Sequence, residues 1–149
     1  MEKDGMTEIV LAAEDKNLEK AQSFVRLQVE NLFKDKQILL QIDLVVEELF
    51  INIAHYAYCA QSGTVRIAAE TDGTVPEVKI TFCDSGIPFN PLERSDPDTT
   101  LPAEQRSVGG LGIFLTKKIM DRVEYRRADG KNILTVTKRT AQAFQSSRL

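Results

Sequence analysis

Tryptophan is absent from this chain, histidine occurs once and cysteine twice. The two cysteines, Cys59 and Cys83, are too few for a disulfide framework and lack the paired spacing of a zinc site. Both are therefore predicted to be small buried apolar residues. His55 has no metal-ligand partner near it in the sequence and is interpreted as a packing or hydrogen-bonding residue. No Ser-His-Asp or Cys-His nucleophile arrangement is legible.

The chain also lacks a large excess of either positive or negative charge. Nineteen Lys and Arg against 22 Asp and Glu leave a net charge of −3, which gives no general attraction to nucleic acid or to an anionic membrane. No stretch approaches the ~20 apolar residues of a membrane span, and the acidic N-terminus lacks the apolar run of a signal peptide. We therefore expect a cytoplasmic protein without direct nucleic-acid or membrane partners.

The composition is that of an ordinary globular domain, with 42% hydrophobic and 28% charged residues. At 149 residues the chain is long enough to bury roughly two-thirds of its unfolded surface in one core. We predict one domain over residues 1–139 and a polar tail over 140–149. Basic residues near the end of the domain lack interleaved aromatics and are interpreted as a solvated sheet edge: Arg122, Arg126, Arg127, Lys131, Lys138 and Arg139.

Hydrophobic periodicity predicts the elements along the chain. Strands are expected at 7–13, 64–69, 77–83, 123–127 and 132–138, and helices at 18–32, 37–60 and 112–120. Residues 88–110 hold four of the five prolines and are predicted to form a long loop, which is usually functional in a compact domain. This order predicts an α+β two-layer sandwich, in which a mixed, largely antiparallel sheet carries its helices on one face.

Glu48 and Asn52 lie one helical turn apart on the predicted central helix and so share a face. An Asn oxygen can hold Mg²⁺ that bridges phosphates, while Glu48 can orient or deprotonate a nucleophile. The alternative is a solvated Glu and Asn on an amphipathic helix. Glu47 is turned about 100° away and is predicted to lie outside this site.

Asp84 ends an apolar strand and precedes Gly86 and Pro88, residues that favour a tight turn. Its carboxylate can accept a hydrogen bond from an amino group such as that of adenine, although a simple turn-forming Asp-x-Gly also explains the pattern. Further along, Gly109, Gly110, Leu111 and Gly112 open a helix. Its free amides and dipole favour phosphate oxygens, with a flexible hinge as the alternative.

Taken in order, three motifs resemble the N box and the two glycine boxes of the GHKL ATPases: Glu48-x-x-x-Asn52, Asp84-x-Gly86-x-Pro88-Phe89-Asn90-Pro91 and Gly109-Gly110-Leu111-Gly112-Ile113. The resemblance implies the Bergerat ATP-binding fold. Within that superfamily the chain is similar, over nearly its whole length, to the anti-sigma regulatory factors, which are bacterial serine/threonine protein kinases. One departure is that Tyr56 stands where the family often has a histidine.

The resemblance implies roles for individual residues. Glu48 corresponds to the general base, Asn52 to the Mg²⁺ ligand and Asp84 to the acceptor of the adenine amino group. The remaining cofactor-binding residues implied are Gly86, Pro88, Gly109, Gly110, Leu111 and Gly112. Residues 90–108 correspond to the lid that closes over ATP.

The function implied is an ATP- and Mg²⁺-dependent kinase that phosphorylates an anti-anti-sigma protein of the STAS fold and sequesters a sigma factor. The resemblance leaves room for a homodimer. The alternative is a catalytically silent module that holds ATP and acts only by sequestering its partner. A third interpretation, a nucleotide-free interaction domain, predicts no stabilisation by Mg-ATP.

Overall fold

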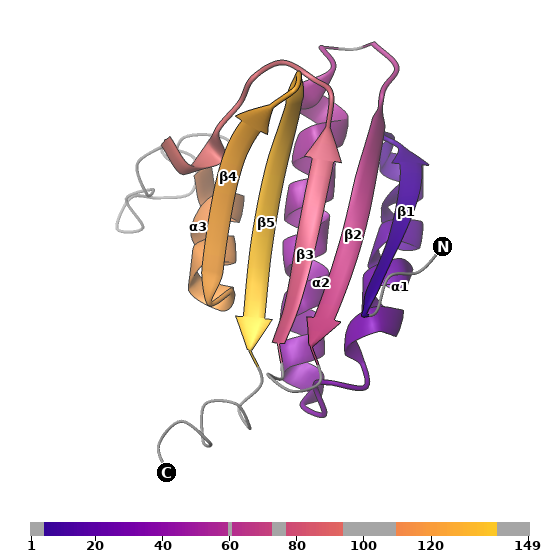
Figure 1. Cartoon of the computed structure of the whole chain (residues 1–149), viewed down its shortest axis with the longest axis vertical. Coiled ribbons are helices and arrows are strands. Elements are labelled where there is room, and N and C mark those ends of the chain that lie inside the picture. Colours follow the sequence, from indigo (N-terminus) through magenta and orange to yellow (C-terminus); the bar gives the residue numbers. More distant parts are fainter. Residues whose placement is uncertain (1–4, 60, 73–76, 94–109, 140–149) are drawn as a thin grey trace.

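A computed structural model describes residues 5–59, 61–72, 77–93 and 110–139. Five strands, three α-helices and three short helical turns follow one another along the chain (Figure 1). Their order is β1 (Met6–Ala12), η1 (Asp15–Asn17), α1 (Leu18–Val29), α2 (Lys36–Asn52), η2 (Ile53–Ala57), β2 (Thr64–Asp72), β3 (Glu77–Asp84), η3 (Pro91–Glu93), α3 (Gly110–Ile119), β4 (Arg122–Ala128) and β5 (Lys131–Arg139).

The strands form one sheet in the order β1-β2-β3-β5-β4, and every pairing among these strands is antiparallel. All three α-helices lie behind the sheet in the view of Figure 1, so they form a second layer on one face. The predicted α+β sandwich is thus confirmed, with an antiparallel sheet rather than a mixed one. Because β5 inserts between β3 and β4, the last strand of the chain becomes an inner neighbour of β3.

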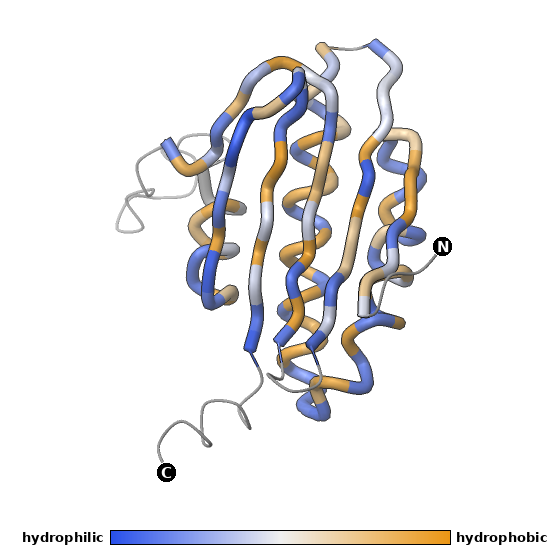
Figure 2. The backbone as a smooth tube through the Cα atoms, in the orientation of Figure 1, coloured by the Kyte–Doolittle hydropathy of each residue, from blue (hydrophilic) through white to orange (hydrophobic). Residues whose placement is uncertain are grey.

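The core lies between the sheet and the helices because the strands alternate apolar and polar residues. In β2 and β3, Val65, Ile67, Val78 and Ile80 are fully buried, whereas Arg66, between the first two, is exposed. Figure 2 shows this alternation as changes of hydropathy along each strand. Burying each such aliphatic side chain stabilises the fold by about 1.5–3 kcal/mol.

The central helix α2 begins at a side-chain cap, where Asp35 accepts a hydrogen bond from the backbone N–H of Gln37 at 2.8 Å. Its α-helical geometry ends at Asn52, and residues 53–57 form the wider π-helical turn η2. The predicted continuous helix to residue 60 is therefore wrong in its last turns. After this turn, the carbonyl of Ala57 accepts a hydrogen bond from the N–H of the distant residue Ile87 at 2.8 Å.

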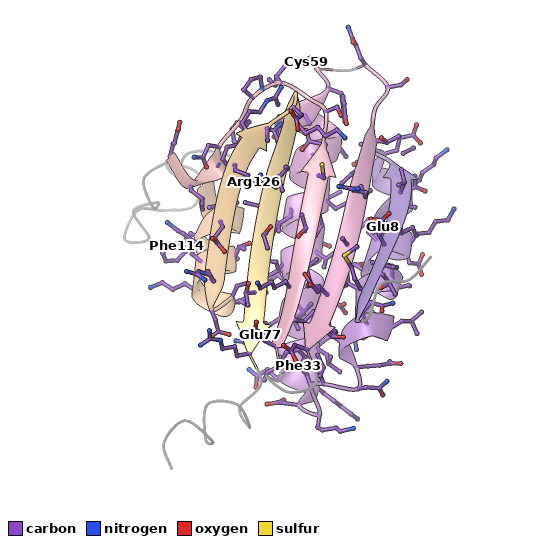
Figure 3. The ribbon with its side chains drawn as sticks, viewed as in Figure 1. Glu8, Phe33, Cys59, Glu77, Phe114 and Arg126 are labelled. Carbon is purple, nitrogen blue, oxygen red and sulfur yellow. The ribbon has the colours of Figure 1, made fainter. Side chains whose placement is uncertain are left out.

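The prediction that both cysteines are buried is half correct. Cys83 is buried in β3, but Cys59 is exposed and adopts a positive φ of 49°. Figure 3 labels Cys59 at the end of the molecule where the chain leaves η2. Burial is not available to it there, because the chain reverses at this point toward β2 and leaves the helix layer.

Several predictions fall on segments that the structure does not describe. Strand β5 ends at Arg139, where the predicted domain ends, and the predicted tail over 140–149 lies outside the described residues. The same holds for most of the predicted lid and for Gly109. Within the described part of the chain, no helix combines the length and apolarity needed to cross a membrane.

Candidate nucleotide-binding site

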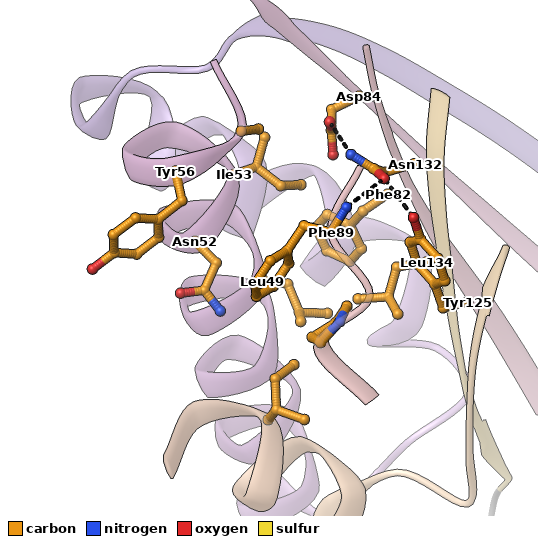
Figure 4. A pocket seen from close by; sticks show the side chains of 13 residues that line it. Leu49, Asn52, Ile53, Tyr56, Phe82, Asp84, Phe89, Tyr125, Asn132 and Leu134 are labelled. Atoms are coloured by element: carbon orange, nitrogen blue, oxygen red, sulfur yellow. Dashed lines mark hydrogen bonds between the residues drawn. The ribbon is translucent and has the colours of Figure 1, made fainter. Parts of the chain in front are cut away.

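A pocket with about 510 Å³ of open space lies between α2, η2 and α3 on one side and the ends of β3 and β5 on the other (Figure 4). Its walls are mostly apolar and its polar groups are few, the usual make-up of a small-molecule site. The lining residues are Leu49, Asn52, Ile53, Tyr56, Ala57, Phe82, Asp84, Phe89, Pro91, Ile113, Tyr125, Asn132 and Leu134.

Asp84 lies at the closed end of this pocket as the last residue of β3, and only 6% of it is exposed. Its Oδ1 accepts two hydrogen bonds, from the backbone N–H of Gly86 and from Nδ2 of Asn132, each at 2.9 Å. The first bond forms the turn that the Asp-x-Gly sequence predicts. Both bonds use the same carboxylate oxygen, and no other described residue donates to this side chain.

Asn132 is the polar residue of the site that sequence analysis missed. It is 6% exposed at the start of β5, directly across from Asp84 in the β3–β5 register. Only its type signalled a role, since Asn is unusual at an inward-facing strand position. The pairing with Asp84 joins residues 48 positions apart and depends on β5 lying beside β3.

The turn after Asp84 is pressed against the end of the central helix. A Cβ on Gly86 would overlap the backbone carbonyl of Ala57, so only glycine fits there. The Tyr58 hydroxyl accepts a hydrogen bond from the N–H of Ser85 at 2.9 Å and donates one to the carbonyl of Thr64. The carbonyl of Ala57 in η2 and the hydroxyl of Tyr58, the next residue, thus hold the turn.

Pro88, predicted to bind the cofactor, is exposed and does not line the pocket, whereas its neighbours Phe89 and Pro91 do. Arg127 was expected to be solvated at a sheet edge. It is exposed on the edge strand β4, as expected, and in addition donates a hydrogen bond from Nη1 to the carbonyl of Gly86 at 2.8 Å. This contact links β4 to the same turn, because β4 lies next to β5 in the sheet.

Glu48 and Asn52 occupy the C-terminal half of α2, beside the first turn of α3. A Cβ on Gly112 would overlap the Glu48 carboxylate, so this carboxylate lies directly against the start of α3. Gly110, Leu111 and Gly112 form that start, as the phosphate-binding prediction requires. Asn52 lines the pocket. The structure thus brings Asn52 and Asp84 to one pocket and sets Glu48 against the start of α3, with Gly109 outside the described residues.

Burial raises the pKa of the Glu48 carboxyl, and the negative charge of Glu47 raises it further. Glu47 was predicted to lie outside the site; its charge nevertheless acts on Glu48, because neighbouring carboxylates disfavour ionising together. A raised pKa makes the ionised carboxylate a stronger base than an ordinary glutamate.

The Asn52 carboxamide makes no hydrogen bond to any described residue, so its oxygen is available to a ligand. No group of three or more His, Cys, Asp or Glu side chains capable of holding a metal occurs in the described part of the chain. A metal in this pocket would therefore have few protein ligands. That donor set suits Mg²⁺, which takes one or two protein oxygens together with phosphates and water.

His55 makes a hydrogen bond, as expected. Its Nε2 lies 2.8 Å from Oδ1 of Asp15, so it ties η2 to η1. Tyr56, at the position where the resemblance expects a histidine, lines the pocket and is 53% exposed. His55 thus makes a structural contact, whereas Tyr56 forms part of the pocket wall.

The fold and the pocket together define an α+β sandwich whose ligand site lies between its central helix and the ends of two inner strands. The sequence model of the histidine kinase-like ATPase domain matches residues 11–138, and the chain belongs to this family. ATP is the nucleotide that this family designation implies.

The proteins to which the chain is similar include a curated relative and solved structures. The chain is 27% identical over 100 residues to the serine/threonine-protein kinase BtrW of Bordetella bronchiseptica, a match that covers 67% of this chain and 70% of that protein. The structure of the RsbU and RsbW domains of a Mycobacterium tuberculosis protein aligns with a TM-score of 0.63 and 16% identity, over 90% of this chain and 32% of that one.

The second structure is the histidine kinase domain of a blue-light activated histidine kinase from Erythrobacter litoralis. It aligns with a TM-score of 0.51 and 18% identity, over 72% of this chain and 47% of that chain. The chain thus spans about a third and about half of the two solved chains. At these identities the structural matches show a shared fold.

Proposed function

We propose that this protein is an ATP- and Mg²⁺-dependent serine/threonine protein kinase of the anti-sigma type. It would phosphorylate an anti-anti-sigma partner of the STAS fold and sequester a sigma factor. The observation that carries the proposal is the placement of Asp84 and Asn52 in one apolar pocket of a histidine kinase-like ATPase domain, with Glu48 beside it against the start of α3. The similarity to a protein named as a serine/threonine kinase supports the choice of reaction.

In this proposal the adenine base enters the apolar pocket and donates a hydrogen bond from its amino group to Asp84. Gly86 keeps the turn beside Asp84 close to the helix layer, which fixes the carboxylate at the end of the pocket. Gly109, Gly110, Leu111 and Gly112 receive the phosphates, because a helix N-terminus carries unpaired N–H groups and a positive dipole end.

Asn52 would hold Mg²⁺ through its carboxamide oxygen. The ion, when bound, neutralises phosphate charge and orients the terminal phosphoryl group. Glu48 lies one helical turn before Asn52 and acts on the partner. Its carboxylate accepts the proton of the serine or threonine hydroxyl while that oxygen attacks the terminal phosphorus and ADP leaves. Positioning and charge neutralisation supply most of the rate in such transfers.

The partners follow from the same proposal. The M. tuberculosis neighbour combines RsbU and RsbW domains in one chain. The kinase relative BtrW is close to this chain in length, since the same 100 matched residues make up 70% of BtrW and 67% of this chain. For this chain we propose a STAS protein as substrate and a sigma factor as the sequestered partner, with residues 1–139 as the ATP-binding domain. A homodimer and a cytoplasmic setting are part of the proposal.

Nucleotide binding is tested by thermal unfolding with and without Mg-ATP, on the native chain and on Asp84→Asn side by side. ATP at one hundred times its dissociation constant should stabilise the native fold by ~2.7 kcal/mol, which raises the midpoint by roughly 5–10 °C in a domain of this size. Asp84→Asn keeps the shape of the side chain but offers an N–H to the base, and should show no shift. An unchanged native midpoint contradicts the proposal.

Phosphoryl transfer is tested separately with radiolabelled ATP and a purified STAS partner. Glu48→Gln should abolish labelling of the partner, because the amide cannot accept the hydroxyl proton, while the complex with the partner still forms. Glu70→Gln, an exposed change on β2, is the matched control and should label the partner normally. Equal labelling by the Glu48→Gln and native proteins would remove Glu48 from the chemistry.

A further inference from the structure

All the hydrogen-bonding capacity of the Asn132 side chain is used. Nδ2 donates to Oδ1 of Asp84 at 2.9 Å and to the carbonyl of Ile87 at 2.8 Å. Oδ1 accepts from the N–H of Phe89 at 3.2 Å and from the hydroxyl of Tyr125 at 2.6 Å. An asparagine has two donor hydrogens and two acceptor lone pairs, so this buried side chain has no capacity left for a ligand.

The partners also fix which way the amide points. Its nitrogen faces Asp84 and Ile87, which both offer oxygen acceptors, and its oxygen faces Phe89 and Tyr125, which both offer hydrogens. Turning the amide by 180° would set oxygen against the Asp84 carboxylate and two donors against each other. Buried polar groups without a hydrogen-bond partner destabilise the folded state, so the amide is held in one orientation.

The fixed amide of Asn132 determines which hydrogen-bonding groups the pocket offers beside Asp84. Oδ1 of Asp84 is occupied by Gly86 and Asn132, which leaves Oδ2 as the oxygen that can accept from a ligand. A free amide at this place could rotate to present either a donor or an acceptor, and so fit either a 6-amino or a 6-oxo purine. Here the amide is locked, and the pocket end offers an acceptor only.

We infer that Asn132 is a positioning residue that makes the pocket selective for a 6-amino purine over a 6-oxo purine, acting through Asp84 and supported by the Tyr125 hydroxyl. The inference rests on the proposed binding of ATP. A 6-oxo purine would place its carbonyl oxygen against the carboxylate, two acceptors without a hydrogen between them. A purine without a 6-substituent would lose one hydrogen bond and meet no repulsion.

The test measures dissociation constants by titration calorimetry for the Mg²⁺ complexes of three nucleotides: ATP, inosine triphosphate and purine riboside triphosphate. For the native chain we expect ATP to bind roughly one hundredfold more tightly than inosine triphosphate, since sites built around one hydrogen bond reject analogues that cannot form it. Asn132→Ala should lower this ratio by about tenfold or more, through weaker ATP binding and unchanged or tighter binding of inosine triphosphate.

Tyr125→Phe is the milder variant. It removes only the hydroxyl that donates to Asn132 and keeps the ring in the pocket wall, so it should lower the ratio in the same direction by a smaller factor. It keeps the test decisive if Asn132→Ala does not fold. Ile53→Ala is the matched control, because this pocket residue belongs to no hydrogen bond of the network. It should weaken all three nucleotides equally and leave the ratio unchanged.

The outcomes separate the two proposals. Binding of ATP with an unchanged selectivity ratio in Asn132→Ala and Tyr125→Phe overturns the role of Asn132 while the ATP site stands. Equal affinity of the native chain for ATP and inosine triphosphate does the same. Binding of none of the three nucleotides by the native chain overturns both the proposed function and this inference.

Discussion

The Glu48 carboxylate lies against the backbone of Gly112, so that the central helix and α3 meet at a point where a side chain on residue 112 has no space. The contact joins the proposed base to the proposed phosphate-binding turn. Thr116, fully buried one turn further on, donates its hydroxyl hydrogen to the carbonyl of Gly112 at 2.8 Å. The relative placement of Glu48 and the start of α3 is therefore built into the packing of two helices.

Gly112→Ala should displace Glu48 more than it disturbs the fold. The new methyl group meets the flexible end of a side chain, which can move, and alanine favours the helix by up to about 1 kcal/mol over glycine. We expect a melting temperature within a few degrees of the native value and a transfer rate at least about tenfold lower. Initial rates with the partner protein measure the effect.

The affinity for Mg-ATP is the check on this explanation. If the methyl group acts through Glu48, Gly112→Ala binds Mg-ATP as tightly as the native protein although its transfer is slower. A weaker affinity for Mg-ATP would place the defect in the phosphate-binding turn itself.

Glu48→Gln should stabilise the protein at neutral pH. Burial, and next the charge of Glu47, raise the pKa of Glu48 in the folded state above its ordinary value of 4.5. The folded protein therefore binds this proton more tightly than the unfolded chain, and ionisation of Glu48 lowers stability as pH rises through the interval between these two pKa values. Because the carboxyl is partly solvated, the gain should stay under about 1 kcal/mol, or no more than about 4 °C.

Melting temperatures of the two proteins between pH 4 and pH 8 measure this gain. The difference should be greatest above the raised pKa and should vanish as pH falls below 4.5. Glu70→Gln, at an exposed position, should show no such trend. A difference that grows toward acid pH would mean that the folded state lowers this pKa.

Gly86→Ala should unfold part of the site. Unlike the methyl group at 112, the one at 86 meets the backbone carbonyl of Ala57, which cannot move without breaking the bond to Ile87. Overpacking of this kind costs about 1–3 kcal/mol. The melting temperature and the affinity for ATP should both fall. Ser85→Ala, at the exposed neighbouring position, should change neither quantity. A native-like melting curve for Gly86→Ala would show that the turn can retreat from the helix.

Tyr58→Phe should destabilise the fold by about 1–2 kcal/mol, since it removes the hydroxyl that joins Ser85 and Thr64. Chemical denaturation measures the loss. Tyr56→Phe is the comparison, because the Tyr56 hydroxyl bonds to no described residue and surface changes of that kind stay within about 0.5 kcal/mol. Equal effects of the two changes would contradict the bridging role of Tyr58.

Much of the architecture could be predicted from local patterns. The period of the apolar residues marks α2 and the alternation in β2 and β3, because burial of one face repeats at the spacing of each element. The motifs around Glu48, Asp84 and Gly112 were predicted to form one site. Asn52, Asp84 and Ile113 line one pocket, and Glu48 lies against Gly112. The end of the α-helical geometry at Asn52 and the exposure of Cys59 could not be predicted, because local patterns do not show where the chain leaves the helix layer.

The sequence by itself determined which segments are helical or extended and which side chains can accept a proton, a metal or an amino group, because these properties belong to single residues and their near neighbours. The tertiary structure alone decided that β5 lies beside β3, so that Asn132 meets Asp84. It likewise decided that Glu48 meets α3, that Arg127 reaches the turn at Gly86, and that Glu48 has a raised pKa. These features depend on strand order and burial, which are set by packing among residues far apart in the chain.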